Sequence, residues 1–122
     1  MSTTDPIEQE IQARASVAPR VTPADIEAEI AGCYYFTALD GVDGYYRGGP
    51  EAQACGHAPE LGLLTFAVLV LRNGFTVTGE SACANPENFD AEIGRKIARQ
   101  NAVNKVRPLL GFRLRDRLHA GL

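Results

Sequence analysis

The residues best suited to chemistry in this sequence are the basic side chains of its C-terminal quarter. Residues 94–122 hold eight Lys and Arg against one acid, Asp116, a net charge of +7. Residues 1–93 hold four basic and fourteen acidic residues, a net charge of −10. Clustered guanidinium and ammonium groups recognise phosphate, either on a nucleotide or along a nucleic-acid backbone. A solvated cationic helix beside acidic neighbours explains the same charges, and such polarity also favours head-to-tail contact between subunits.

Two stretches supply candidate ligand-binding side chains. Tyr45-Tyr46-Arg47 can stack rings and a guanidinium on a flat ligand, although an ordinary flexible loop anchored by tyrosines is the alternative. In the basic stretch, the amides Gln100, Asn101 and Asn104 continue the apolar stripe of Ile93 and Ile97. They are candidates for hydrogen bonds to a ligand or to another subunit. Alternatively, the helix leaves the sheet at this point and the amides face solvent. The predicted ligand-binding residues are Tyr45, Arg47, Arg95, Arg99, Asn101, Lys105 and Arg113.

Catalytic and metal chemistry have little support in the sequence. Cys55-Gly56-His57 could form a zinc site with Cys33 and Cys83, but no CxxC-type spacing accompanies it. There is no nucleophile with an adjacent base, and no Walker-type or dinucleotide-type glycine pattern. We therefore predict a non-enzymatic protein with no catalytic residue, no metal and no cofactor.

The cysteine count and the apolar runs indicate the compartment. Three cysteines disfavour a secreted disulfide framework, and the first residues lack the basic and apolar regions of a signal peptide. The longest apolar run, Leu61 to Leu71, is about half the roughly 20 residues that span a membrane. These features predict a soluble cytoplasmic protein without a membrane partner.

A β-hairpin from Thr65 to Cys83 is the strongest structural signal. Asn73-Gly74 between two β-rich runs predicts a two-residue type I′ turn, which pairs Val70 with Val77 and Val68 with Gly79. That register places Phe66, Val68, Val70, Phe75 and Val77 on one face, and Ala67, Leu69 and Leu71 opposite Thr76, Thr78 and Glu80 on the other. The first strand is apolar on both faces and needs cover on both. One cover is the following helix; the second is an N-terminal helix, the C-terminal segment or another subunit, so a homo-oligomer is expected.

Helices flank this hairpin. Thr22-Pro23-Ala24-Asp25 predicts a helix start, with the helix running to about Thr37 and a loop over residues 40–60. After the hairpin, a long helix is predicted from about Phe89 to Val106, interrupted at Pro108 and followed by a second helix that ends at Gly121. On the long helix, Phe89, Ile93 and Ile97 form the packing face, and Ala91, Ala98 and Ala102 form a ridge suited to a helix–helix contact.

Together these elements predict an α+β fold. Residues 22–122 form one small domain with an N-terminal helix, a β-hairpin and C-terminal helices, in the order α-β-β-α-α. Residues 1–21 are expected to form a flexible N-terminal arm, with a short helix or docking on a neighbour as alternatives.

Three segments carry a family resemblance. They are Leu64–Cys83 across the hairpin, Asn85–Ala102 with its Ile-Gly-Arg-Lys-Ile-Ala-Arg-Gln-Asn run, and Pro108–Leu114, with the upstream Tyr35-Phe36-Thr37-Ala38. Together they resemble the phage gene-49/gene-66 family over residues 22–118, with Arg107 in place of an expected aromatic residue. The resemblance implies a small accessory protein of a tailed phage or prophage that acts in the host cytoplasm.

Two functions from different classes fit this combination. The first is a small-ligand binder that sequesters a host nucleotide signal, a counter-defence role. The second is a nucleic-acid-binding or host-protein interaction module that uses the basic C-terminal helices.

Overall fold

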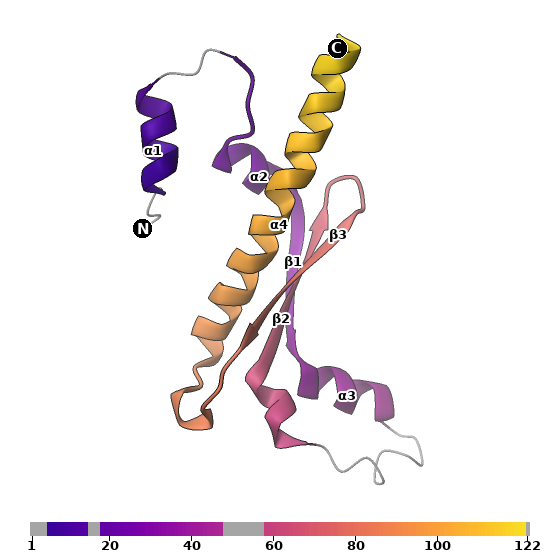
Figure 1. Ribbon diagram of the computed structural model, residues 1–122. Helices are drawn as coiled ribbons and strands as arrows, with labels where there is room; N and C mark the ends of the chain where they lie inside the picture. Colours follow the sequence, from indigo (N-terminus) through magenta and orange to yellow (C-terminus); the bar gives the residue numbers. More distant parts are fainter. Residues whose placement is uncertain (1–4, 15–17, 48–57, 122) are drawn as a thin grey trace.

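The computed structural model describes residues 5–14, 18–47 and 58–121. Within these residues there are four helices and a three-stranded antiparallel sheet, which confirms the α+β class and a small domain built around the predicted hairpin (Figure 1). The elements in chain order are α1 (Pro6–Ala13), α2 (Pro23–Glu29), β1 (Ile30–Thr37), α3 (Ala38–Tyr46), the 3₁₀ turn η2 (Pro59–Leu63), β2 (Leu64–Leu71), β3 (Thr76–Ala82), the 3₁₀ turn η3 (Pro86–Asn88) and α4 (Ala91–Ala120).

The sheet has the strand order β1-β2-β3, so β2 is its central strand. Helix α4 crosses one face of the sheet, against β2 and β3 (Figure 1). The core lies between them: every second residue of β2, from Thr65 to Leu71, is buried toward α4. The core residues are Ile26, Ala67, Leu69, Leu71, Val77, Ala98, Ala102, Val106 and Leu110.

The hairpin exists, but its predicted register is wrong by one residue. Leu69 pairs with Val77 and Val68 with Thr78, because the turn contains three residues, Arg72 to Gly74, instead of two. Gly74 takes the left-handed conformation, with φ at 89°, as three-residue hairpin loops require. A slip of one residue turns every side chain of β3 to the other face, so Val77 and Gly79 face α4 while the Thr78 side chain faces away.

The predicted helix from Thr22 to about Thr37 is also wrong in its second half. Helix α2 ends at Glu29, and residues 30–37 form β1 along β2. Tyr34, Tyr35 and Phe36 are aromatic residues that favour strands, and the alternating pairing of β1 with β2 stabilises them there. The sheet therefore has a third strand that the predicted order lacked.

The predicted loop over residues 40–60 is partly helical. Thr37 caps α3: its hydroxyl accepts a hydrogen bond from the Asp40 backbone N–H, and the Asp40 carboxylate accepts one from the Thr37 backbone N–H. This reciprocal capping box starts a helix that ends at Tyr46, and η2 resumes regular structure at Pro59. Residues 48–57 lie outside the described part of the chain.

The two C-terminal helices that the sequence predicted are a single helix. Helix α4 continues through Pro108 to Ala120, because the exposed Pro108 leaves its missing hydrogen bond on the solvent side. Its buried stripe is Gly94, Ala98, Ala102, Val106 and Leu110. The alanine ridge therefore packs on the sheet and not on another helix, and the side chains predicted to pack, Ile93 and Ile97, are 55% and 46% exposed.

Small residues bring α4 unusually close to β3. A Cβ built on Gly79 would collide with the Ala98 carbonyl oxygen and the Ala102 amide nitrogen, and would lie 2.9 Å from the Ala102 Cα. Gly79 is therefore required by the approach of the helix backbone, and the contact sets the height of α4 above the sheet.

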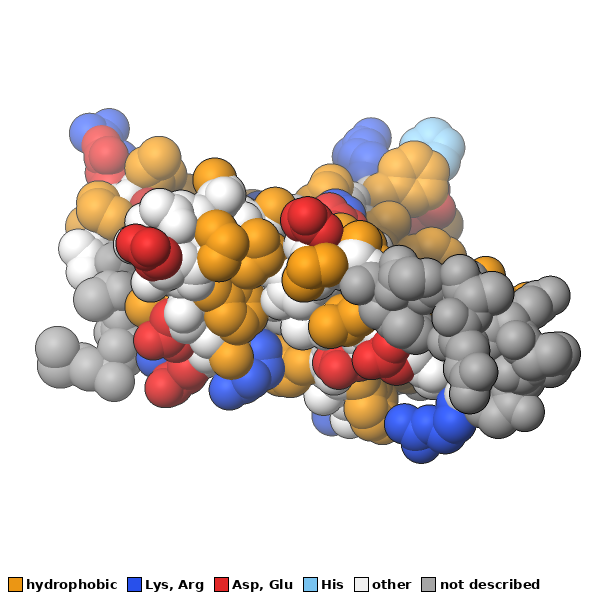
Figure 2. All heavy atoms as spheres, turned by 90° about the horizontal axis from the view of Figure 1, so that it is seen from below, with side chains coloured by type: hydrophobic (Ala, Val, Ile, Leu, Met, Phe, Trp, Pro, Cys, Tyr) orange, Lys and Arg blue, Asp and Glu red, His pale blue; other side chains and the backbone are white. Residues whose placement is uncertain are grey.

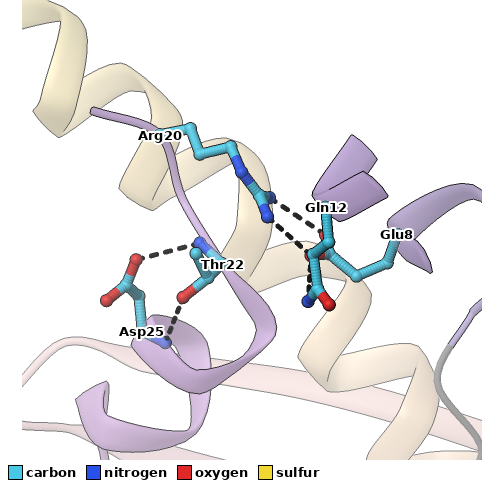
Figure 3. Close-up of polar contacts among 5 residues, drawn as sticks. All are labelled: Glu8, Gln12, Arg20, Thr22 and Asp25. Carbon is cyan, nitrogen blue, oxygen red and sulfur yellow. Dashed lines mark hydrogen bonds and ion pairs between the residues drawn. The ribbon is translucent and has the colours of Figure 1, made fainter. Parts of the chain in front are cut away.

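Helix α1 is fastened through a buried carboxylate. Glu8 is 4% exposed, and both its oxygens accept hydrogen bonds from Arg20, at 3.0 and 2.7 Å, while Gln12 donates to the same carboxylate (Figure 3). The neighbouring Thr22 and Asp25 form a second capping box at the start of α2. A helix thus occupies part of the predicted N-terminal arm, while the flexibility of residues 1–21 stays a prediction.

Candidate functional site

Two of the predicted ligand-binding arginines are held by carboxylates of α2. Arg99 forms a two-pronged pair with Glu27, at 3.1 and 2.9 Å, and Arg113 donates to Glu29 at 2.7 Å. In each case the hydrogen bond with the arginine lowers the pKa of the glutamate below its ordinary value. These pairs fasten α2 along α4, so both guanidiniums already have structural partners.

Asn101 and Lys105 lie on the opposite side of α4, beside β3. The Asn101 amide donates to the backbone carbonyl of Glu80 at 2.8 Å, and the Lys105 ammonium lies 3.8 Å from the Glu80 carboxylate. Asn101 therefore contacts the edge strand of the sheet, whereas Gln100 donates a hydrogen bond to Asn104, so at Asn101 the helix has not left the sheet.

Tyr45 and Arg47 lie at the far end of α3. The Tyr45 ring is 80% exposed and meets the ring of Tyr46 edge to face, with centroids 4.8 Å apart. Arg47 is exposed and follows the helix. The structure therefore does not bring the seven predicted residues together at one site.

Arg95 lines a groove at the start of α4, whereas Arg113 lines the cleft described below. The groove has a volume of about 140 Å³ and lies where β1 passes into α3, beside the first turn of α4. We call it the Arg95 groove; its lining residues are Tyr35, Phe36, Thr37, Asp40, Thr65, Phe89, Ala91 and Arg95. Figure 2 views this end of the molecule and shows hydrophobic side chains interspersed with acidic ones.

The groove combines rings, hydroxyls and one cation. Phe36 lines the groove from β1, but its ring stacks on Phe66 on the sheet face opposite α4, with centroids 5.3 Å apart, and is 40% exposed. Arg95 forms no ion pair within residues 5–14, 18–47 and 58–121. Its charge is therefore available to an anionic ligand, whereas Arg99 one turn later is occupied by Glu27.

The Tyr35 phenol is a hydrogen-bond donor in this groove. A tyrosine phenol is an O–H at neutral pH. Desolvation, followed by the interaction with the Cys33 thiol, raises the pKa of Tyr35 further above its ordinary value. With the Thr37 and Thr65 hydroxyls and the Asp40 carboxylate, the groove offers donors and acceptors around the Arg95 cation.

A second cationic cleft lies at the other end of the molecule. It has a volume of about 260 Å³ between α2, the hairpin turn and the C-terminal half of α4, and Arg20, Arg72, Arg113 and Arg117 line it together with Asp25 and Glu29. Arg20 is held by Glu8 and Arg113 by Glu29, so Arg72 and Arg117 are the cations of this cleft without an ion pair among the described residues.

Sequence reasoning found Arg95 but missed the residues around it. The sequence pattern predicts Tyr35 and Thr37 in a helix, Asp40 in a loop and Thr65 only in the hairpin. One signal was available: Thr37-x-x-Asp40 has the same capping-box pattern as Thr22-x-x-Asp25, and both start helices here.

The other predicted chemistry is tested only in part by the structure. Cys55 and His57 of the hypothetical zinc site lie outside the described residues. Among those that are described, no three His, Cys, Asp or Glu side chains lie close enough to hold a metal ion. The described helices include none that is long and apolar enough to cross a membrane.

Comparison with known protein families gives a match. A family model described as phage protein (N4 Gp49/phage Sf6 gene 66) family matches residues 21–118, which is more than half of the chain. No curated protein matches the chain, and no solved structure matches it.

Proposed function

The chain belongs to the phage protein (N4 Gp49/phage Sf6 gene 66) family. From this premise, we propose that it is a non-enzymatic accessory protein that binds a small nucleotide in the Arg95 groove. By sequestering a nucleotide signal in the host cytoplasm, such a protein would act against a host defence. The observation that carries the proposal is a guanidinium without an ion pair beside aromatic rings and hydroxyls.

The groove chemistry favours a nucleotide over a bare phosphate. Arg95 suits a phosphate, the Tyr35 and Phe89 rings suit a base, and the Asp40 carboxylate can accept a hydrogen bond from a ribose hydroxyl or an exocyclic amine. At about 140 Å³ the groove is smaller than the roughly 300 Å³ and above of pockets that enclose a whole ligand. It would therefore bury one ring or phosphate and leave the rest of the nucleotide at the surface.

The proposed absence of catalysis follows from the same residues. The titratable groups that line the groove are Tyr35, Asp40 and Arg95, and the Asp40 carboxylate is engaged by the Thr37 backbone N–H. This set provides charge and hydrogen bonds to a ligand, but lacks a nucleophile with an adjacent base.

Isothermal titration against a panel of linear and cyclic nucleotides, with inorganic phosphate alongside, tests the proposal. Arg95→Gln should weaken nucleotide binding by about 10- to 100-fold, the loss expected for a charge-assisted hydrogen bond. Arg115→Gln on the same helix, which lines none of the described grooves, is the matched control and should bind as the wild type. Equal binding by Arg95→Gln and wild type, or silence across the panel, overturns the proposal.

A second candidate is a nucleic-acid or host-protein module that uses the basic end of the molecule. The observation in its favour is the cleft with Arg72 and Arg117. Shift assays with DNA and RNA at several salt concentrations distinguish the two candidates. Each phosphate of duplex DNA that the protein contacts releases counterions and adds about −0.9 to the slope of log binding constant against log salt concentration. A steep slope favours this candidate if Arg72→Gln and Arg117→Gln make the slope shallower and Arg95→Gln leaves it unchanged.

A further inference from the structure

The attachment of α1 to the rest of the described chain centres on one side chain. The Glu8 carboxylate accepts hydrogen bonds from both terminal nitrogens of Arg20, at 3.0 and 2.7 Å (Figure 3). Within residues 5–14, 18–47 and 58–121, this is the ion pair that joins α1 to another segment. Apolar packing adds little, because the two isoleucines of α1, Ile7 and Ile11, are 67% and 38% exposed. Loss of the Glu8–Arg20 pair would therefore free α1.

Arg20 is also part of the cationic cleft between α2, the hairpin turn and α4. The arginines that line this cleft are Arg20, Arg72, Arg113 and Arg117. The hydrogen bond with Arg113 lowers the pKa of Glu29, and the charges of Arg72 and Arg117 lower it further, because both guanidiniums lie near this carboxylate. Arg20 keeps 25% of its side chain exposed while it holds Glu8. Glu8 and an anion in the cleft therefore share one arginine.

The charges of the cleft favour an anion that carries several charges. Arg113 is paired with Glu29, whereas Arg72 and Arg117 have no ion pair among the described residues. Departure of Glu8 adds Arg20 as a third arginine without a carboxylate partner. A guanidinium binds phosphate oxygens with the same two-pronged geometry that it offers to a carboxylate. An oligophosphate can therefore replace Glu8 on Arg20 and also reach its neighbours, which a single carboxylate cannot do.

We propose that Glu8 is an intramolecular competitor for an oligophosphate ligand of this cleft, and that the ligand takes Arg20 from Glu8 and displaces α1. Chains with Glu8 in place offer Arg72 and Arg117 alone, so the apparent affinity falls with the fraction of chains in which α1 is displaced. The phosphates can belong to a small oligophosphate or to a nucleic-acid backbone. The proposal does not depend on the Arg95 groove, because Arg95 does not line this cleft.

Isothermal titration of the full chain with inorganic tripolyphosphate tests the proposal. Glu8→Gln removes the competing charge and keeps the shape of the side chain, so it should tighten binding by about 10-fold, the change expected when one charge-assisted contact no longer competes. Glu10→Gln is the matched control, because it removes the same charge from the same helix. Glu10 pairs with Arg14 inside α1, and its replacement should leave binding as in the wild type.

Titration with duplex DNA identifies the source of the phosphates. If Glu8→Gln tightens the binding of DNA as well, the cleft takes the phosphates of a nucleic-acid backbone. If it tightens the binding of tripolyphosphate alone, the cleft takes a small oligophosphate. Either result supports competition by Glu8.

Hydrogen exchange of the wild type gives a second measurement that needs no variant. The backbone N–H groups of Gln9 and Arg14 donate within α1, so they should exchange faster when tripolyphosphate saturates the chain, while those of α4 keep their rates. The proposal is overturned if Glu8→Gln and the wild type bind tripolyphosphate equally, if neither binds it, or if saturation leaves the exchange of α1 unchanged.

Discussion

Replacing Gly79 by alanine should destabilise the fold far more than one added methyl group suggests. The new Cβ would collide with backbone atoms of α4 at Ala98 and Ala102, which cannot rotate away as a flexible side chain would. Relief requires the helix to move by roughly 1 Å from β3, which loosens the buried alanine contacts on both sides of the collision. Overpacking of this kind costs typically 1–3 kcal/mol, and because both contacts are with backbone we expect about 3 kcal/mol for Gly79→Ala.

Urea unfolding followed by circular dichroism measures this effect. With a slope of about 2 kcal/mol per molar, a loss of about 3 kcal/mol lowers the midpoint by about 1.5 M. Gly111→Ala is the control, since a Cβ at Gly111 has no atom within 4 Å and alanine is a better helix former by up to about 1 kcal/mol. A Gly79→Ala midpoint within error of the wild type would refute the close approach of α4 to β3.

Two further predictions concern α4 and its ion pairs. Pro108→Ala restores a backbone N–H that can donate to the Asn104 carbonyl inside one continuous helix. It should therefore raise the free energy of unfolding by about 1 kcal/mol or more. No gain in stability would mean that the helix ends at Pro108, as the sequence pattern predicts. The second prediction concerns pH. Arg113 lowers the pKa of Glu29 in the folded chain, so the pair stabilises the fold at pH values above the pKa of Glu29 in the unfolded chain. This stabilisation is lost as the pH falls through the pKa of Glu29 in the folded chain. When the pH is lowered from 7 to 3, the urea unfolding midpoint of Glu29→Gln should therefore decrease less than that of the wild type. Equal decreases would contradict a stabilising role of the pair.

The hairpin illustrates what local sequence determines and what it leaves open. Asn73-Gly74 identified the turn, because both residues tolerate the conformations that tight turns need. The same pair also suits a three-residue loop, in which Gly74 is left-handed and the Asn73 side chain accepts the Phe75 N–H. The length of the loop decides the register of the strands. Packing of Val77 and Gly79 against α4 selects the three-residue loop over the two-residue loop.

Strand β1 shows the limit of periodicity. Ile26, Ile30 and Cys33 repeat at helical spacing, which extended the predicted helix across residues 30–37. The strand forms because its residues pair with β2 residues 28 to 41 positions later, from Thr37–Thr65 to Ile30–Leu71, a contact that no short window contains. The Arg95 groove was hidden for the same reason, since Tyr35, Thr37 and Asp40 reach Arg95 only once β1 is in the sheet.

Four of the eight basic residues in residues 94–122 form ion pairs with acids among the described residues. Arg99, Lys105 and Arg113 of the basic helix meet acids of the first 93 residues, and Lys96 pairs with Glu92 one turn away. The basic stretch thus serves first to fasten α4 to α2 and β3. The cations of this stretch without an ion pair in residues 5–14, 18–47 and 58–121 are Arg95, Arg107, Arg115 and Arg117. Of these, Arg95 alone lines a groove that also presents aromatic rings, so Arg95→Gln tests the proposed nucleotide binding without removing an ion pair of the described residues.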